Sequence, residues 1–137
     1  PTMLQQHHRA LIYTMVLVSA AASSMADAEL RTIGEIVGHL PIFRDFNRAA
    51  LPGLLNDCAE LLAREDGLEQ TLAAIKTGLP AKLRDTAYAI ACDLVAADGA
   101  ATQEELRALE LLRHRLNLDR LIAAAIERGA RARFQTL

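Results

Sequence analysis

The sequence has few aromatic residues and no strong excess of charge of either sign. Aromatic residues make up 4% of the chain and tryptophan is absent, whereas β-strands are enriched in aromatic and β-branched side chains. Alanine, leucine, glutamate and arginine are abundant instead, and these residues favour helices. Because the formal net charge is only −2, the molecule as a whole is not attracted to nucleic acid, and we expect no nucleic-acid partner.

Cysteine is scarce as well. The two cysteines, Cys58 and Cys92, lie far apart in the sequence, and no CxxC pattern exists. This spacing supports neither a zinc ribbon nor a redox pair. We therefore predict two buried, reduced thiols in a cytoplasmic protein, since free cysteine usually behaves as a small buried apolar residue.

No apolar run is long enough to predict a transmembrane helix. The longest run, residues 10–22, is interrupted by Thr14 and Ser19, and a bilayer needs about 20 apolar residues. The preceding His7-His8-Arg9 gives this region a superficial similarity to a secretory signal peptide. We interpret the run as a helix of the folded domain, because an internal repeat extends into it.

The length of 137 residues predicts a single domain spanning residues 1–137 with its own core. Apolar residues three and four positions apart predict an all-α fold of about seven helices. The first helix is expected to begin at residue 4 or 8 and end at 21, and the second to begin between residues 24 and 27 and end at 38. The next four are expected at 52–66, 68–77, 80–97 and 102–116, and the last begins at 119. The segment 41–50 is expected to be an ordered connector whose Phe43 and Phe46 fill the bundle.

One segment of the second half occurs again in the first half at a constant offset of 76 residues. Ala22 corresponds to Asp98, and Leu30 corresponds to Leu106. In both copies an alanine-rich helix end leads into a short loop, and an acidic first turn then opens an amphipathic helix. The repeat predicts a pseudo-two-fold helical bundle built from two related helical halves.

Short motifs predict where the last two helices begin and end. Thr102 and Glu105 form a T-x-x-E pattern, which is typical of a capping box. Asn117 is expected to end that helix in the left-handed conformation, and Asp119 is expected to cap the next helix.

The second copy carries carboxylates typical of a site for a hard cation. Asp98, Glu104 and Glu105 lie close together at one helix start, and oxygen ligands suit Ca²⁺, Mg²⁺ or Mn²⁺. An EF-hand is excluded, because placing Gly99 at the sixth loop position puts residues that cannot ligate at positions one and three. Alternatively, Asp98-Gly99 is an ordinary turn and the acids only complement the helix dipole.

The first copy retains only part of this pattern. Asp27 and Glu29 remain, but Ala22 and Ala26 stand where the second copy has an acid and a helix cap. A metal site that needs equivalent acids from both loops would therefore be defective in this chain.

No motif predicts catalysis. The sequence has no glycine-rich phosphate loop, no nucleophile elbow and no triad spacing, and its four histidines show no HExxH pattern. The C-terminal segment is basic through Arg128, Arg131 and Arg133. These arginines either complement the end of a helix or contact an anionic partner or membrane surface.

The repeated acidic motif resembles the tellurite-resistance TerB family, whose domain also recurs in TerB-like and DnaJ-like co-chaperone proteins. The resemblance covers nearly the whole chain. The matching segments are 94–99 (LVAADG), 102–106 (TQEEL), 18–21 (VSAA), 25–30 (MADAEL), 31–37 (RTIGEIV) and 126–133 (IERGARAR). The chain departs from the family pattern at Ala22, Ser23 and Ala26, which puts metal binding by the first half in doubt.

The resemblance implies an all-helical, pseudo-symmetric fold and a non-enzymatic role in resistance to tellurite and related stresses. It implies an acidic cluster that holds a divalent metal, carried over to Asp98, Glu104, Glu105, Asp27 and Glu29. It also implies a membrane-protein partner in a tellurite-resistance complex, and hence a cytoplasmic location, peripheral to the inner membrane of a bacterium.

Three hypotheses about function follow. The first is a stress-response protein that binds a divalent metal, docks a membrane-associated resistance complex, or does both. The second is a metal-independent scaffold or protein-interaction module, similar to the TerB-like domain of co-chaperones. The third is an architectural bundle whose only contacts are with other copies of itself.

Overall fold

The computed structural model describes residues 5–21, 27–97, 99 and 101–137. These residues form seven α-helices, three short 3₁₀ helices and no strand, which confirms the all-α prediction. The α-helices are α1 (Gln6–Ala20), α2 (Asp27–His39), α3 (Leu51–Leu62), α4 (Gly67–Gly78), α5 (Arg84–Ala97), α6 (Gln103–Arg115) and α7 (Arg120–Arg133).

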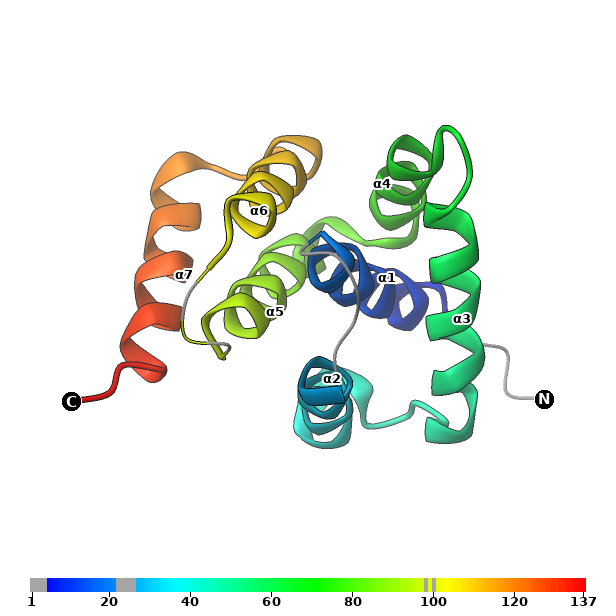
Figure 1. The fold of residues 1–137 in the computed structure, drawn as a ribbon, viewed down its shortest axis with the longest axis horizontal. Helices are drawn as coiled ribbons and strands as arrows, with labels where there is room; N and C mark the ends of the chain where they lie inside the picture. Colours follow the sequence, from blue (N-terminus) through cyan, green and yellow to red (C-terminus); the bar gives the residue numbers. More distant parts are fainter. Residues whose placement is uncertain (1–4, 22–26, 98, 100) are drawn as a thin grey trace.

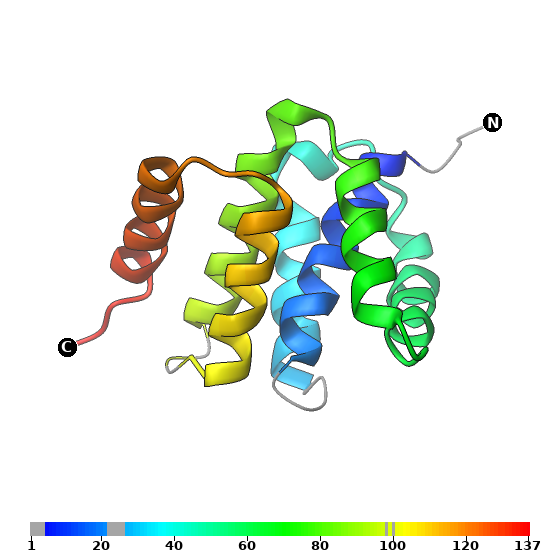
Figure 2. The same cartoon turned by 90° about the horizontal axis from the view of Figure 1, so that it is seen from above.

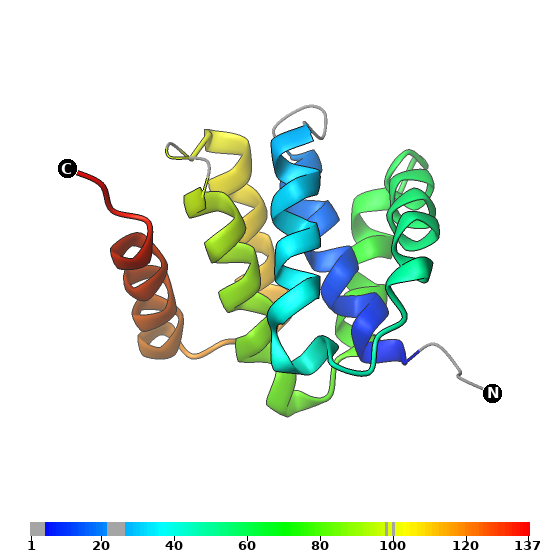
Figure 3. The same cartoon turned by 90° about the horizontal axis from the view of Figure 1, so that it is seen from below.

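Helices α1 and α5 pack against each other at the centre of the molecule (Figure 1). Helices α3 and α4 pack on α1, and α7 packs on α5. Figures 2 and 3 show the consequence, with α7 at one edge of the molecule and the α3–α4 pair toward the other. Within the described ranges, no helix combines the length and the apolar character that crossing a membrane requires.

The repeat in the sequence corresponds to a repeat in the structure. Helix α2 (Asp27–His39) and helix α6 (Gln103–Arg115) begin and end 76 residues apart. Helix α2 packs on α5, and α6 packs on α1. This exchange of contacts between the α1–α2 pair and the α5–α6 pair is the arrangement expected of two related hairpins.

Helix α1 is buried on nearly all sides. Its buried residues run without interruption from Ala10 to Ser19, which is typical of a helix at the centre of a bundle. Helix α4 approaches α1 closely at Gly78, where an added Cβ would lie 3.0 Å from the Cβ of Ala10.

The connector between α2 and α3 is ordered, as expected. It contains two 3₁₀ helices, Pro41–Phe43 and Arg48–Ala50. Phe43 and Phe46 are buried and pack on the imidazole of His8, with centroid separations of 5.5 and 5.3 Å. His8 Nε2 also lies 2.7 Å from the carbonyl oxygen of Ile42, which fixes the connector to the start of α1.

The predicted helix boundaries hold at the end of the chain and fail at two earlier helices. Helix α3 ends at Leu62, before the Asp66-Gly67 pair that was expected to end it. Asn117 has a φ of 57°, and the carboxylate of Asp119 accepts hydrogen bonds from the first turn of α7. Helix α5 does not begin at Pro80, because Pro80 is extended and a 3₁₀ turn, Ala81–Leu83, precedes the helix. Leu68, in the first turn of α4, is 45% exposed.

Candidate functional site

The acidic residues of the second repeat differ sharply in environment. Glu104 is exposed, whereas Glu105 is only 3% exposed. Asp98 lies outside the described residues. Helix α6 itself begins where the sequence predicts, so the first turn that carries these acids is correctly placed.

Glu105 is held by the cap of its own helix. Its Oε1 accepts a hydrogen bond from the backbone N–H of Thr102 at 2.9 Å. In return its own N–H donates to Thr102 Oγ1 at 3.0 Å. Both predicted halves of the capping box are therefore formed, and one oxygen of the Glu105 carboxylate is engaged in the start of α6.

Among the described residues, the acids of the first repeat lie on α2 and those of the second repeat lie on α6. Asp27 is exposed and Glu29 is buried, both in the first turn of α2. The first turns of α2 and α6 lie at the same end of the molecule in Figure 3, but Figure 1 shows the two helices on opposite sides of the α1–α5 pair. In the part of the chain that the structure describes, no three histidine, cysteine or acidic side chains gather to hold a metal.

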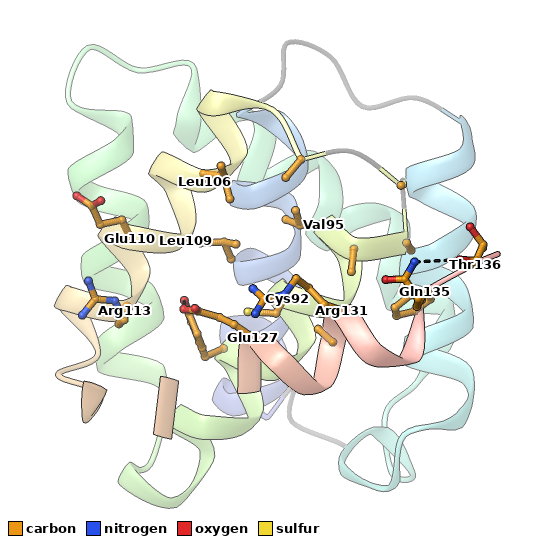
Figure 4. Close-up of a pocket in the computed structure, with 17 residues that line it drawn as sticks. Cys92, Val95, Leu106, Leu109, Glu110, Arg113, Glu127, Arg131, Gln135 and Thr136 are labelled. Carbon is orange, nitrogen blue, oxygen red and sulfur yellow. Dashed lines mark hydrogen bonds between the residues drawn. The ribbon is translucent and has the colours of Figure 1, made fainter. Parts of the chain in front are cut away.

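A groove of about 740 Å³ lies on the other side of α6, between α6 and α7. Helix α5 forms its floor, because α6 and α7 both pack on α5 and make little contact with each other. Figure 4 shows side chains from all three helices around this space. Its apolar lining includes Val95, Leu106, Leu109, Ala130 and Phe134, and we call it the α6–α7 groove.

A hydrogen bond crosses the floor of the groove. The Tyr88 hydroxyl on α5 donates to Glu127 Oε2 on α7 at 2.5 Å. Burial, and then this hydrogen bond, raise the pKa of Tyr88 far above its ordinary value. Burial, together with the nearby Glu127 carboxylate, raises the pKa of Cys92 to about 12. Both groups are therefore uncharged at neutral pH, and the thiol of Cys92 is a poor nucleophile.

The charged groups at the groove are not equally partnered. Glu110 Oε1 lies 3.5 Å from Arg107 Nη1, and Glu127 accepts the hydrogen bond from the Tyr88 hydroxyl. Arg113 and Arg131 also line the groove, and within the described ranges neither forms an ion pair. Arg113 Nη2 lies 3.5 Å from Nε2 of its neighbour His114. The groove thus combines an apolar lining with two positive charges that, among the described residues, lack a carboxylate partner.

Helix α7 has a second unusual surface on the side that faces away from α5. Ala123 and Ala130 are its only fully buried residues, and every residue of this helix is described. Leu121 is 81% exposed and Ile122 is 44% exposed, and Ala125 and Arg128 are exposed nearby. We call these last four residues the outer face of α7.

Sequence reasoning did not identify either surface. Helical spacing places Leu121, Ile122, Ala125 and Ile126 near one another on the last helix, but only Ile126 packs against the core, and the other three are exposed. The sequence indicated Arg131 only as part of a basic tail, whereas this residue lines the α6–α7 groove. Arg133, the third arginine of that tail, is paired with Asp93 on α5.

Comparison of the chain with protein-family models, with curated proteins and with solved structures gave no significant match.

Proposed function

We propose that this protein is a non-enzymatic bacterial stress-response module of the TerB type, which docks an acidic partner through the outer face of α7. The observation that carries the proposal is the exposure of Leu121 and Ile122 on a helix that buries only two residues. Large exposed apolar side chains grouped together are typical of protein-interaction surfaces. The resemblance to TerB proteins supports a membrane-associated tellurite-resistance complex as that partner.

The charge of α7 favours an acidic partner. The helix contains four arginines and one glutamate. Arg120 and Arg128 are exposed, and within the described parts of the chain neither forms an ion pair. Exposed charges of one sign speed up association with a partner of the opposite sign and orient it. Docking of this kind needs no metal, in agreement with the hypothesis of a metal-independent scaffold.

The test compares exposed apolar residues on two different helices. Leu121→Glu/Ile122→Glu should abolish sedimentation of the protein with inner-membrane vesicles from a tellurite-resistant bacterium, and should abolish rescue of tellurite survival in a strain without its own copy. The control Leu68→Glu changes a leucine that is 45% exposed on α4 and should leave both unchanged. Full sedimentation and rescue by the α7 variant would refute the proposal, and sedimentation that disappears with chelator would favour a metal-dependent contact.

A divalent-metal site is a second candidate function. The acidic first turns of α2 and α6 lie at the same end of the bundle (Figure 3). The described carboxylates do not form such a site by themselves, because Glu29 is buried and Glu105 is engaged in the cap of α6. This candidate therefore rests on Asp98 and Glu104, with Ca²⁺, Mg²⁺ or Mn²⁺ as the ion.

Thermal unfolding of chelator-treated protein tests the metal site directly. A cation present at about 100 times its Kd should add about 2.7 kcal/mol to the free energy of unfolding. Asp98→Ala should remove that gain without changing helix content. A gain seen only in the Ala22→Asp/Ser23→Gly variant would show that the site needs both loops and that this chain has lost it.

A further inference from the structure

The connector between α6 and α7 does not fill the α6–α7 groove. The first half of the molecule places Phe43 and Phe46 beside α1 from a long connector. The connector between α6 and α7 is only residues 116–119, and it contains no aromatic ring. Its residue Asn117 turns the chain in the left-handed conformation. No ring from this connector is therefore available to fill the space that separates α6 from α7.

The size of the groove suits a small molecule. Its volume of about 740 Å³ falls within the range of roughly 300–1,000 Å³ that is usual for ligand sites. Gln135 and Thr136 line the groove together with residues at the end of α5, and Figure 4 shows both at one end of it. A groove bounded at one end favours a short ligand over a long helix that passes through it.

The lining indicates a ligand with an apolar chain. Leu106 is 48% exposed and Phe134 is 43% exposed, although both are large apolar side chains. Leu106 belongs to α6 and Phe134 follows the last residue of α7, and Val95 of α5 lines the groove with them. A ligand chain lying between these side chains would remove apolar surface from water on three helices at once, which is favourable.

The charges indicate a negative head group. Arg113 and Arg131 have no carboxylate partner among the described residues, and Glu110 is paired with Arg107. Glu127 accepts the hydrogen bond of the uncharged Tyr88 hydroxyl and keeps its negative charge. Figure 4 shows Arg113 at the end away from Gln135 and Thr136, and Arg131 between the two ends. Guanidinium groups bind carboxylates well, because their planar donors match the two carboxylate oxygens.

We propose that the α6–α7 groove binds a medium-chain fatty carboxylate, with its alkyl chain between Leu106 and Phe134 and its carboxylate at Arg113 and Arg131. The proposal does not depend on the docking function of α7, because Leu121, Ile122 and Arg128 do not line the groove. Glu127 lies beside the expected head group and should weaken its binding through like-charge repulsion.

The experiment is displacement of a dansylated undecanoate probe from the purified chain by laurate and by dodecanol. Laurate should displace the probe saturably, and dodecanol should bind about tenfold more weakly because it lacks the charge-assisted hydrogen bonds. Arg113→Gln/Arg131→Gln should weaken laurate about tenfold and leave dodecanol unchanged. Glu127→Gln should strengthen laurate, because the introduced amide can still accept the Tyr88 hydrogen bond but carries no charge.

A matched control separates this proposal from the docking function. Arg120→Gln/Arg128→Gln also removes two positive charges, both from α7 and outside the groove, and should leave laurate affinity unchanged. The proposal is overturned if laurate and dodecanol bind equally, if the two double variants behave alike, or if the probe does not bind saturably. It is also overturned if an acidic amphipathic peptide displaces the probe and laurate does not. If the Arg113→Gln/Arg131→Gln variant does not fold, the comparison of laurate with dodecanol on the unmodified chain still tests the proposal.

Discussion

The hydroxyl of Tyr88 on α5 donates a hydrogen bond of 2.5 Å to Glu127 Oε2 on α7. It is a polar link between the central pair and a peripheral helix whose only buried residues are two alanines. Because Glu127 is half-buried, its carboxylate depends on this donor more than an exposed carboxylate would.

Tyr88→Phe should therefore destabilise the protein by about 1–2 kcal/mol, since the Glu127 carboxylate would lose a charge-assisted hydrogen bond. Urea unfolding followed by circular dichroism measures the change. Glu127→Gln keeps an acceptor for the Tyr88 hydroxyl and should cost less. Equal stability of Tyr88→Phe and the unmodified protein would show that this bond does not hold α7 in place.

The capping box at α6 should contribute measurably to stability. Thr102→Ala removes the acceptor for the Glu105 N–H, and loss of a helix cap costs about 1 kcal/mol. Glu104→Ala, in the same helical turn but exposed, should change stability by less than about 0.5 kcal/mol. Thermal unfolding of the two variants, compared side by side, checks the difference. A similar loss in both would mean that charge near the helix start matters more than the cap.

Asn117 should be replaceable by glycine but not by alanine. Its φ of 57° lies in the left-handed region, which costs an L-residue such as alanine about 1 kcal/mol and costs glycine little. Asn117→Ala should lower the free energy of unfolding by about that amount, and Asn117→Gly should keep it nearly unchanged. Chemical denaturation distinguishes them, and an alanine variant as stable as the glycine variant would contradict this prediction.

Stability should fall in alkaline solution because of the two buried thiols. Burial raises the pKa of Cys58 and of Cys92 from 9.0 to about 12. Below pH 9 both thiols are protonated in the folded and unfolded states, so their contribution to the free energy of unfolding is fully present. As the pH rises from 9 toward 12, the thiols ionise in the unfolded chain before they ionise in the folded protein, and this stabilising contribution is lost. Urea unfolding between pH 7 and 10.5 should show this decline, and the Cys58→Ala/Cys92→Ala variant should show a shallower one. If the free energy of unfolding falls equally steeply with pH in both proteins, other groups such as Tyr88 dominate the pH dependence.

The repeat was the strongest guide to the fold. Its offset of 76 residues correctly related α2 to α6, because both helices use the same spacing of apolar residues and an acidic first turn. The caps at Thr102 and Asp119 were also predictable, since a cap depends on side chains within one helical turn.

The candidate metal site was less predictable, for a physical reason. Sequence spacing places Glu104 and Glu105 side by side, but they are neighbours on a helix, and successive residues point about 100° apart around its axis. One carboxylate faces solvent, and the other is buried in the cap. Sequence spacing alone therefore cannot establish whether a group of acids can converge on one ion.

By itself, the sequence determined the helical class, the number of α-helices, the repeat and the caps. These follow from local spacing of apolar residues and from short hydrogen-bonding motifs. Only the tertiary structure decided that α6 and α7 both pack on α5 with little contact between them. It also decided that Arg131 lines the groove between these two helices and that Leu121 faces solvent. Those outcomes depend on which helices pack together, and an apolar helix face does not specify its partner until the whole bundle is assembled.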